Sequence, residues 1–247
     1  MNEAQSNESI AVRNMEAALR RIERQIPPPQ KVLLHGHPVL RYVEQTIQQA
    51  LVAKLARHIS NLNAASILLE CGHVHEQGIL QRVMDEGGSD IFFLALGLVK
   101  NDLTERHSQL LEEFWKEEFD APNALDSSQD RAQPRRDKIR SYVAKYSGPD
   151  PSTAIKAERS VYKTYSGYIH GAAPHIMDLH SVACEGFSVR GVAGTYRQDA
   201  HRADLRNYYF RTLSATAMVA KAVGDGALCS QMADSAEAYA QAEGLQV

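Results

Sequence analysis

The second half of the chain contains four polar side chains at helical spacing: Arg159, Lys163, Ser166 and His170. Their offsets of 4, 7 and 11 residues place them on one face of a helix. A histidine beside a fixed cation can act as a general acid or base on a phosphodiester, and neighbouring Tyr165 could assist. The sequence therefore predicts a candidate catalytic set formed by His170, Lys163, Ser166 and Tyr165. The alternative is a polar helix face with an interior histidine.

Basic residues are concentrated in the same part of the chain. The net charge of the chain is −3, yet residues 131–221 hold 15 basic and 7 acidic residues, a difference of +8. Four histidines and several tyrosines lie in this segment, and such a composition suits phosphate contact and base stacking. The candidate polyanion-binding residues are Arg159, Arg197, Arg202, Arg206, His175 and His180. The alternative is that these charges pair with the acidic N-terminal half or lie on a solvated face.

A second constellation could hold a metal ion. Glu70 and His73 stand three residues apart, which matches one half of the di-iron pattern of helical bundles. The second Glu-x-x-His is missing, and His75-Glu76 lacks the later histidine of a zinc protease helix. Glu70 and His73 are therefore weak metal-ligand candidates, and no cofactor is expected. Glycine-rich nucleotide-binding motifs and the G-x-S-x-G motif of hydrolases are also missing.

The composition predicts a folded, soluble protein. Of 247 residues, 44% are hydrophobic and 23% charged, which excludes a disordered or collagen-like chain. The longest apolar run, Ile91 to Val99, is much shorter than the ~20 residues needed to cross a bilayer. The polar first residues lack the features of a signal peptide, so we expect a cytoplasmic protein without a membrane partner. The three cysteines are too widely spaced for a disulfide framework or a zinc knuckle, and we expect them in the core.

The spacing of hydrophobic residues predicts helices along almost the whole chain. The predicted segments are 11–26, which ends before three prolines; 40–86, divided near Ser60-Asn61 and stopped by Gly87-Gly88; 91–99; 102–119, with Asp102 and Glu105 as a capping box; 139–146; 151–170, with Asp150 as N-cap; 201–222; and 226–243. No segment alternates long enough to predict a strand, so the expected fold class is all-α, a multi-helix bundle. We expect a single domain over 1–247 with a polar N-terminal arm, and a possible internal boundary at 120–135.

Two pieces of the sequence carry a resemblance to known proteins. They are LLECGHVHEQGILQRVMDE, in which Arg82 precedes Glu86 by four residues, and VYKTYSGYIHGA, which contains Tyr165-Ser166-x-x-x-His170. Over roughly Leu40 to Ala173 the chain resembles an uncharacterised group of bacterial all-helical proteins, itself loosely similar to the HEPN superfamily. In the ribonucleases of that superfamily four to six residues separate an arginine from a following histidine, and here six residues separate Lys163 from His170.

The resemblance implies a homodimer that binds or cleaves RNA without a metal, as a component of a toxin, stress or antiphage system. It leaves open whether the chain is an enzyme. The first alternative is a protein-interaction module of such a system with no chemistry of its own. The second is a metal-dependent helical enzyme. Arg82 and Glu86 are expected to form a structural pair that holds their helix to a neighbour.

Overall fold

The fold is a bundle of long helices, as the hydrophobic spacing predicts. The computed structural model describes residues 6–130, 134–146, 148, 150–181 and 185–245. The helices packed together at its centre are α1 (Asn7–Glu23), α2 (Ile47–Glu70), α3 (Val74–Val99), α8 (Tyr196–Ala222) and α9 (Gly226–Glu243). The other helices are α4 (Glu105–Trp115), η1 (Ala124–Asp126), α5 (Arg136–Ala144), α6 (Pro151–Ile169) and α7 (Ala173–Met177). The all-α class is therefore confirmed.

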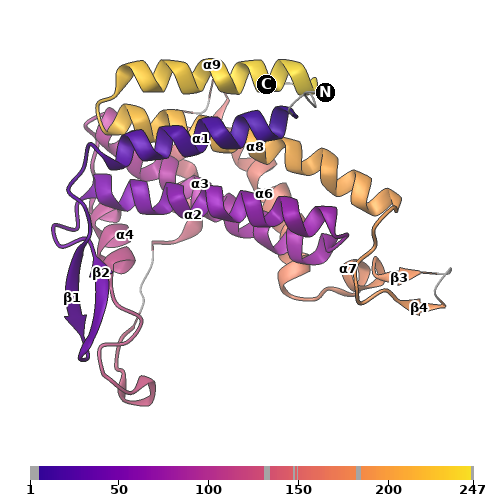
Figure 1. Ribbon diagram of the computed structural model, residues 1–247, viewed down its shortest axis with the longest axis horizontal. Helices are drawn as coiled ribbons and strands as arrows, with labels where there is room; N and C mark the ends of the chain where they lie inside the picture. Colours follow the sequence, from indigo (N-terminus) through magenta and orange to yellow (C-terminus); the bar gives the residue numbers. More distant parts are fainter. Residues whose placement is uncertain (1–5, 131–133, 147, 149, 182–184, 246–247) are drawn as a thin grey trace, which may run out of the picture.

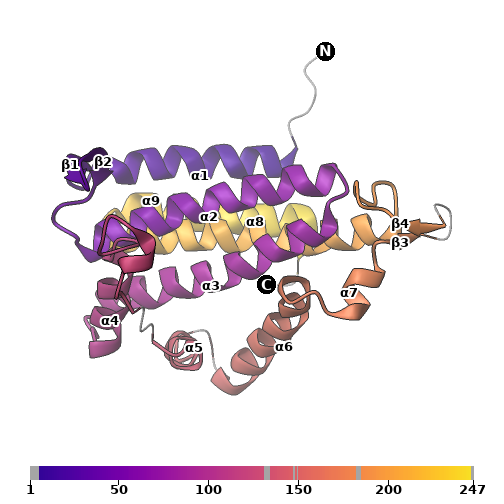
Figure 2. The ribbon, with the colours of Figure 1, turned by 90° about the horizontal axis from the view of Figure 1, so that it is seen from below.

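The long helices bury one shared hydrophobic core. In Figure 2, α1 lies on one side of the molecule, α5 and α6 lie on the other, and α2, α8 and α3 lie between them. The fully buried side chains come from every layer and include Met15 of α1, Leu55 of α2, Phe93 of α3 and Leu213 of α8. Burial of such side chains supplies most of the favourable free energy of folding. No described helix has the length and apolar character needed to cross a membrane.

Two segments extend from the bundle and give the molecule an arched outline (Figure 1). One is a hairpin of β1 (Gln30–Leu34) and β2 (His37–Arg41), and the other carries α7 and the short pair β3 (His180–Ser181) and β4 (Gly186–Phe187). The prediction that the chain has no strand is wrong for these residues. The hairpin depends on a two-residue turn in which His35 and Gly36 both have positive φ, of 49° and 83°. In the sequence, this turn is a stronger sign of a hairpin than the short alternation of apolar and polar residues beside it.

Several predicted helix boundaries are wrong. A capping box formed by Thr46 and Gln49 starts α2 at Ile47. Leu40, the predicted first residue of this helix, lies in β2. The break between α2 and α3 falls at Cys71–His73, and not near Ser60-Asn61, because Gly72 takes a φ of +79° and lies against Ala193. Helix α3 passes through Gly87-Gly88, and the predicted helix 91–99 is its last part.

Helix α4 also differs from its prediction at both ends. Its N-cap is Thr104, whose partner at the third position is His107, in place of Asp102 and Glu105. It ends at Trp115, and Phe119 lies beyond it and is exposed. The predicted start of α6 is confirmed, since the Asp150 carboxylate accepts a hydrogen bond from the Ser152 amide. The final helix pair is confirmed as well, although α8 begins at Tyr196.

The cysteines do not all lie in the core as predicted. Cys71 is exposed because it caps the end of α2, and Cys229 is half-buried. Cys184 lies outside the described residues.

Close approach of α3 to α6 brings the two quoted sequence pieces together. A Cβ added at Gly78 would lie 2.9 Å from the Tyr168 ring, so only glycine fits there. We expect Gly78→Ala to lower the free energy of unfolding by about 1–3 kcal/mol, because the ring has to move. Denaturant titration of both proteins measures this difference.

Gly87→Ala is the matched control in the same helix. Its Cβ would lie 3.4 Å from His58 Nδ1, an ordinary contact, so the better helix propensity of alanine should stabilise the protein by up to ~1 kcal/mol. Equal effects of the two substitutions would contradict the packing described here.

Candidate functional site

Helix α6 presents two faces of different character. Arg159, Lys163 and His170 are exposed on its outer face, and Ser166 is half-buried beside them. Tyr165 is only 6% exposed and points into the bundle. The structure thus brings three of the four candidate catalytic side chains to one face and directs Tyr165 away from them.

Tyr165 has a structural partner in the interior. Its hydroxyl donates a hydrogen bond to Asp204 Oδ2 of α8 at 2.9 Å. Burial, with the nearby Tyr208 and Asp204, raises the pKa of Tyr165 far above its ordinary value, so this phenol stays protonated. It therefore ties α6 to α8 and is not available as a base.

His170 lies at the C-terminal end of α6. Its amide donates to the Ser166 carbonyl at 3.1 Å and closes the last turn of the helix. Lys163 lies seven residues earlier, about 10 Å along the axis at ~1.5 Å per residue. The two side chains thus start two helical turns apart on the same face of α6.

Three of the predicted polyanion-binding arginines are paired with carboxylates. Arg197 lies 2.5 Å from Asp178, Arg202 lies 2.9 Å from Glu70, and Arg206 lies 3.1 Å from Glu243. The carboxylate partner offsets the charge of each arginine, which therefore presents less net positive charge to a further anion. The alternative, in which basic residues of segment 131–221 pair with the acidic N-terminal half, thus holds for Arg202, whereas Arg206 pairs with Glu243 near the C-terminal end.

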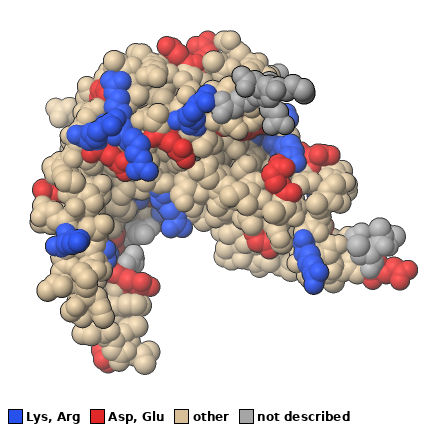
Figure 3. Space-filling view, in the orientation of Figure 1, with Lys and Arg blue, Asp and Glu red and all other residues tan. Residues whose placement is uncertain are grey.

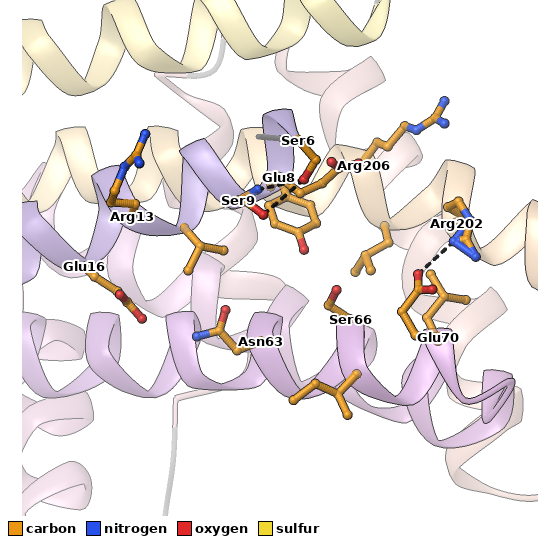
Figure 4. Close-up of a pocket in the computed structure, with 15 residues that line it drawn as sticks. Ser6, Glu8, Ser9, Arg13, Glu16, Asn63, Ser66, Glu70, Arg202 and Arg206 are labelled. Carbon is orange, nitrogen blue, oxygen red and sulfur yellow. Dashed lines mark hydrogen bonds and ion pairs between the residues drawn. The ribbon is translucent and has the colours of Figure 1, made fainter. Parts of the chain in front are cut away.

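Arg202 and Arg206 line a groove between α1, α2 and α8 (Figure 4). The groove has a volume of about 680 Å³. Its charged lining residues balance in sign: Arg13, Arg202 and Arg206 against Glu8, Glu16 and Glu70. On this side of the molecule basic and acidic side chains are interspersed, as Figure 3 shows. The groove therefore does not select a polyanion.

The two other candidate histidines pack against aromatic rings. His175 Nε2 lies 3.1 Å from the Thr164 carbonyl oxygen, and its ring centroid lies 4.4 Å from that of Tyr168. The His180 ring lies 5.2 Å from the ring of Phe187, across the small β3–β4 pair. Tyr208 and Tyr209, which the composition suggested for base stacking, are buried. Most of this aromatic surface is thus committed to the fold.

Three cations remain on the outer face of α6. Lys156, Arg159 and Lys163 are exposed, and no carboxylate of the described residues lies within ion-pair distance of any of them. We call these three residues the basic face of α6. The only acidic residue of α6, Glu158, points inward instead. This face has the unpaired positive charge that an anionic partner requires.

The weak metal candidates do not converge. Glu70 pairs with Arg202, and His73 Nδ1 lies 3.6 Å from Glu76 at the start of α3. Among the described residues no group of three or more histidine, cysteine, aspartate or glutamate side chains is arranged to hold a metal ion.

The expected Arg82–Glu86 pair is present and reaches a neighbouring helix. Arg82 Nη2 donates to Glu86 Oε1 at 2.6 Å within α3. The Arg82 guanidinium is nearly fully buried and lies 3.8 Å from the centre of the Tyr162 ring of α6. The pair therefore holds α3 to α6 through a cation–π contact.

Sequence reasoning missed a polar cluster beneath α6. Asp85 Oδ1 accepts hydrogen bonds from Arg211 at 2.7 Å and from the Tyr208 hydroxyl at 3.1 Å. Glu158 Oε1 accepts from the Ser89 hydroxyl at 3.2 Å. Burial raises the pKa of the Glu158 carboxyl, and the charge of Arg140 opposes this only in part. These residues come from three helices far apart in sequence, so spacing along the chain could not group them.

Comparison of the chain with protein-family models, with curated proteins and with solved structures gave no match.

His58 of α2 lies at the edge of the buried polar cluster and makes stability depend on pH. It is 4% exposed, and burial, helped by the charge of Arg211, lowers its pKa to about 4. The unfolded chain binds this proton near the ordinary pKa of 6.5, so between pH 6.5 and 4 the unfolded state holds more protons than the folded state. The free energy of unfolding therefore decreases as the pH is lowered from 6.5 to 4. We expect the wild type to lose about 3 kcal/mol more than His58→Gln between pH 7 and pH 4. Urea titrations across this range measure the difference.

His37→Gln, at an exposed position of the hairpin, is the control and should follow the wild-type curve. Parallel curves for the wild type and His58→Gln would show that His58 titrates normally in the folded protein.

Proposed function

We propose that the protein binds single-stranded RNA or a similar polyanion through the basic face of α6. The observation that carries this proposal is the absence of carboxylate partners for Lys156, Arg159 and Lys163 among the described residues, whereas the arginines of α8 are paired. The three cations recur every three or four residues, so they form one row along about 10 Å of helix. Such a row suits the phosphates of an extended strand.

Contacts of this kind recognise the backbone and not the bases. The buried tyrosines offer no stacking platform next to the basic face of α6, and Tyr162 is enclosed between two guanidinium groups, Arg82 and Arg140. We therefore expect binding with little sequence preference and a steep dependence on salt. The candidate catalytic side chains do not converge within one chain, so the proposal is binding without cleavage.

Removal of the three cations should weaken RNA binding in a salt-dependent way. We expect Lys156→Gln, Arg159→Gln and Lys163→Gln together to reduce the slope of log K against log salt by about 2, because each phosphate contact on a single strand contributes ~0.7. Fluorescence anisotropy with a labelled single-stranded RNA at several salt concentrations measures both slopes.

The matched control removes the same charge elsewhere: Lys31→Gln, Arg106→Gln and Lys221→Gln, all at exposed positions. It should leave the slope almost unchanged. An equal decrease of the slope in both triple variants would show that net charge, and not the basic face of α6, determines RNA binding. RNA cleavage that survives a chelator and disappears in His170→Ala would replace the binding proposal by a ribonuclease.

A second candidate function, contact with a protein partner, is favoured by the hairpin. Its register places Leu33 opposite Pro38 and Lys31 opposite Leu40 on one face, and Leu33 and Leu40 are 77% and 59% exposed. Apolar side chains presented together on a projecting hairpin are typical of an interaction surface. The first partner to consider is a second copy of the chain, since the resemblance implies a homodimer.

If this surface joins two copies, Leu33→Ser with Leu40→Ser should convert a dimer into a monomer without changing the helix content. Sedimentation velocity over a range of protein concentrations measures the association. Val189→Ser is a suitable control because this side chain is also highly exposed, at 79%, but lies at the other extension. A wild type that is monomeric at all concentrations would leave only a different protein as the partner of the hairpin.

A further inference from the structure

A cleft beneath α6 is built from two adjoining chambers. Each chamber has a volume of roughly 250–270 Å³, and both are lined by Ser89 of α3, Glu158 of α6 and Arg211 of α8. The cleft thus follows the inner side of α6, opposite the basic face. Concave sites that combine apolar walls with a few polar groups are the usual form of small-molecule sites.

The first chamber is polar and contains one cation without a carboxylate partner. Arg211 is neutralised by Asp85, at 2.7 Å. Arg140 of α5 stacks on the Tyr162 ring, 4.2 Å from its centre, and no described carboxylate lies within ion-pair distance of it. The guanidinium of Arg140 therefore retains donors for an incoming anion.

Glu158 is the only other charged group of that chamber. Burial raises the pKa of this carboxyl, so it keeps its proton to a higher pH than an ordinary glutamate does and neutralises Arg140 less completely. The groups that line the cleft around it are Asp85 of α3, Arg140 of α5, Tyr162 of α6, Arg211 of α8 and His58 of α2. With Glu158 protonated, the fixed charges of the cleft sum to a positive value.

The second chamber is mainly apolar and has one polar group without a partner. Phe92, Val143 and Phe210 line it, together with Gly88 and His58. The His58 side chain is buried, and its Nδ1 atom has no hydrogen-bond partner among the residues that the structure describes. Buried polar atoms in native proteins are almost always bonded, so an unpaired ring nitrogen at a cavity wall indicates a place for a ligand or a water molecule.

We propose that this cleft binds a small organic carboxylate, with the carboxylate group at Arg140 and Arg211 and an apolar body in the chamber lined by Phe92, Val143 and Phe210. A ligand of this class satisfies the unpaired guanidinium and fills the apolar chamber at the same time. A purely apolar ligand would leave Arg140 without an anion. An amino acid would add an ammonium group to a cleft in which, with Glu158 protonated, positive charges already exceed negative ones.

Calorimetry with three compounds that share one body tests the proposal: 3-phenylpropionate, 3-phenyl-1-propanol and phenylalanine, each titrated into the full chain. We expect 3-phenylpropionate to bind about tenfold more tightly than the alcohol, as one charge-assisted hydrogen bond allows, and the amino acid to bind more weakly still. Equal affinities for the acid and the alcohol, tighter binding of phenylalanine, or no binding of the acid would each overturn it.

Two variants locate the bound acid. Arg140→Met should remove the preference for the acid over the alcohol, whereas Lys138→Met, an exposed position on the same helix, should keep it. Unchanged preference in Arg140→Met would exclude the cleft as the binding site.

Glu158→Gln keeps the shape of the side chain and gives a readout that a folding defect does not produce. In the wild type, affinity for the acid should fall as pH rises and Glu158 loses its proton, because two carboxylates then share the chamber. In Glu158→Gln the affinity should not change over the pH values at which Glu158 titrates in the wild type and the ligand carboxylate is ionised. A pH dependence that persists in Glu158→Gln would contradict the assigned position of the carboxylate.

Discussion

The carboxylate of Asp85 joins the two helices that enclose the interior of this protein. It accepts hydrogen bonds from Arg211 and Tyr208 of α8 while it belongs to α3, at a depth where only 9% of the residue is exposed. A buried carboxylate without such partners would be costly, since removal of one partner from a buried pair typically destabilises a protein by ~3–5 kcal/mol. The position of α8 relative to α3 is thus fixed by polar contacts as well as by hydrophobic packing. Asp85 and Arg211, which this contact fixes, both line the cleft beneath α6.

The same principle explains why the basic segment is less available than its composition suggests. A charge difference of +8 over residues 131–221 includes arginines that serve the fold, on α8 and on α5. Arg136, for example, bridges α5 to Asp90 of α3, and Lys54 of α2 reaches the same carboxylate. A row of three exposed cations without such partners among the described residues, Lys156, Arg159 and Lys163, is left on the outer face of α6.

Much of the fold could be predicted from the sequence because helix formation is encoded locally. The spacing of apolar residues and the Asp150-Pro151 start signal identify α6, and the Gly224-Asp225-Gly226 break separates α8 from α9. The hairpin could not be identified by alternation, since its stability depends on the turn at His35-Gly36. Gly87-Gly88 was misleading as a stop signal because α3 continues through both glycines, which lie against the His58 ring of α2.

The candidate site was predictable only in part. Helical spacing correctly grouped Arg159 with Lys163 on the outer face of α6, although it left out Lys156, and it correctly paired Arg82 with Glu86. It also grouped Tyr165 with His170, although they lie on different faces. The cluster of Asp85, Glu158 and Arg211 is formed by helices that meet only after folding, and no local pattern marks such a meeting.

The hairpin has a further property that follows from its register. Leu34 and His37 flank a two-residue turn, so they form a hydrogen-bonded pair, and the next pair, Leu33 and Pro38, directs its backbone groups outward to the open edges. Proline has no amide hydrogen to offer there. The edge of β2 near the tip is therefore a poor template for an additional strand, from another copy of this chain or from any extended peptide. A protein that contacts this hairpin must cover its leucine side chains from above, and the projecting ribbon is protected from edge-to-edge polymerisation.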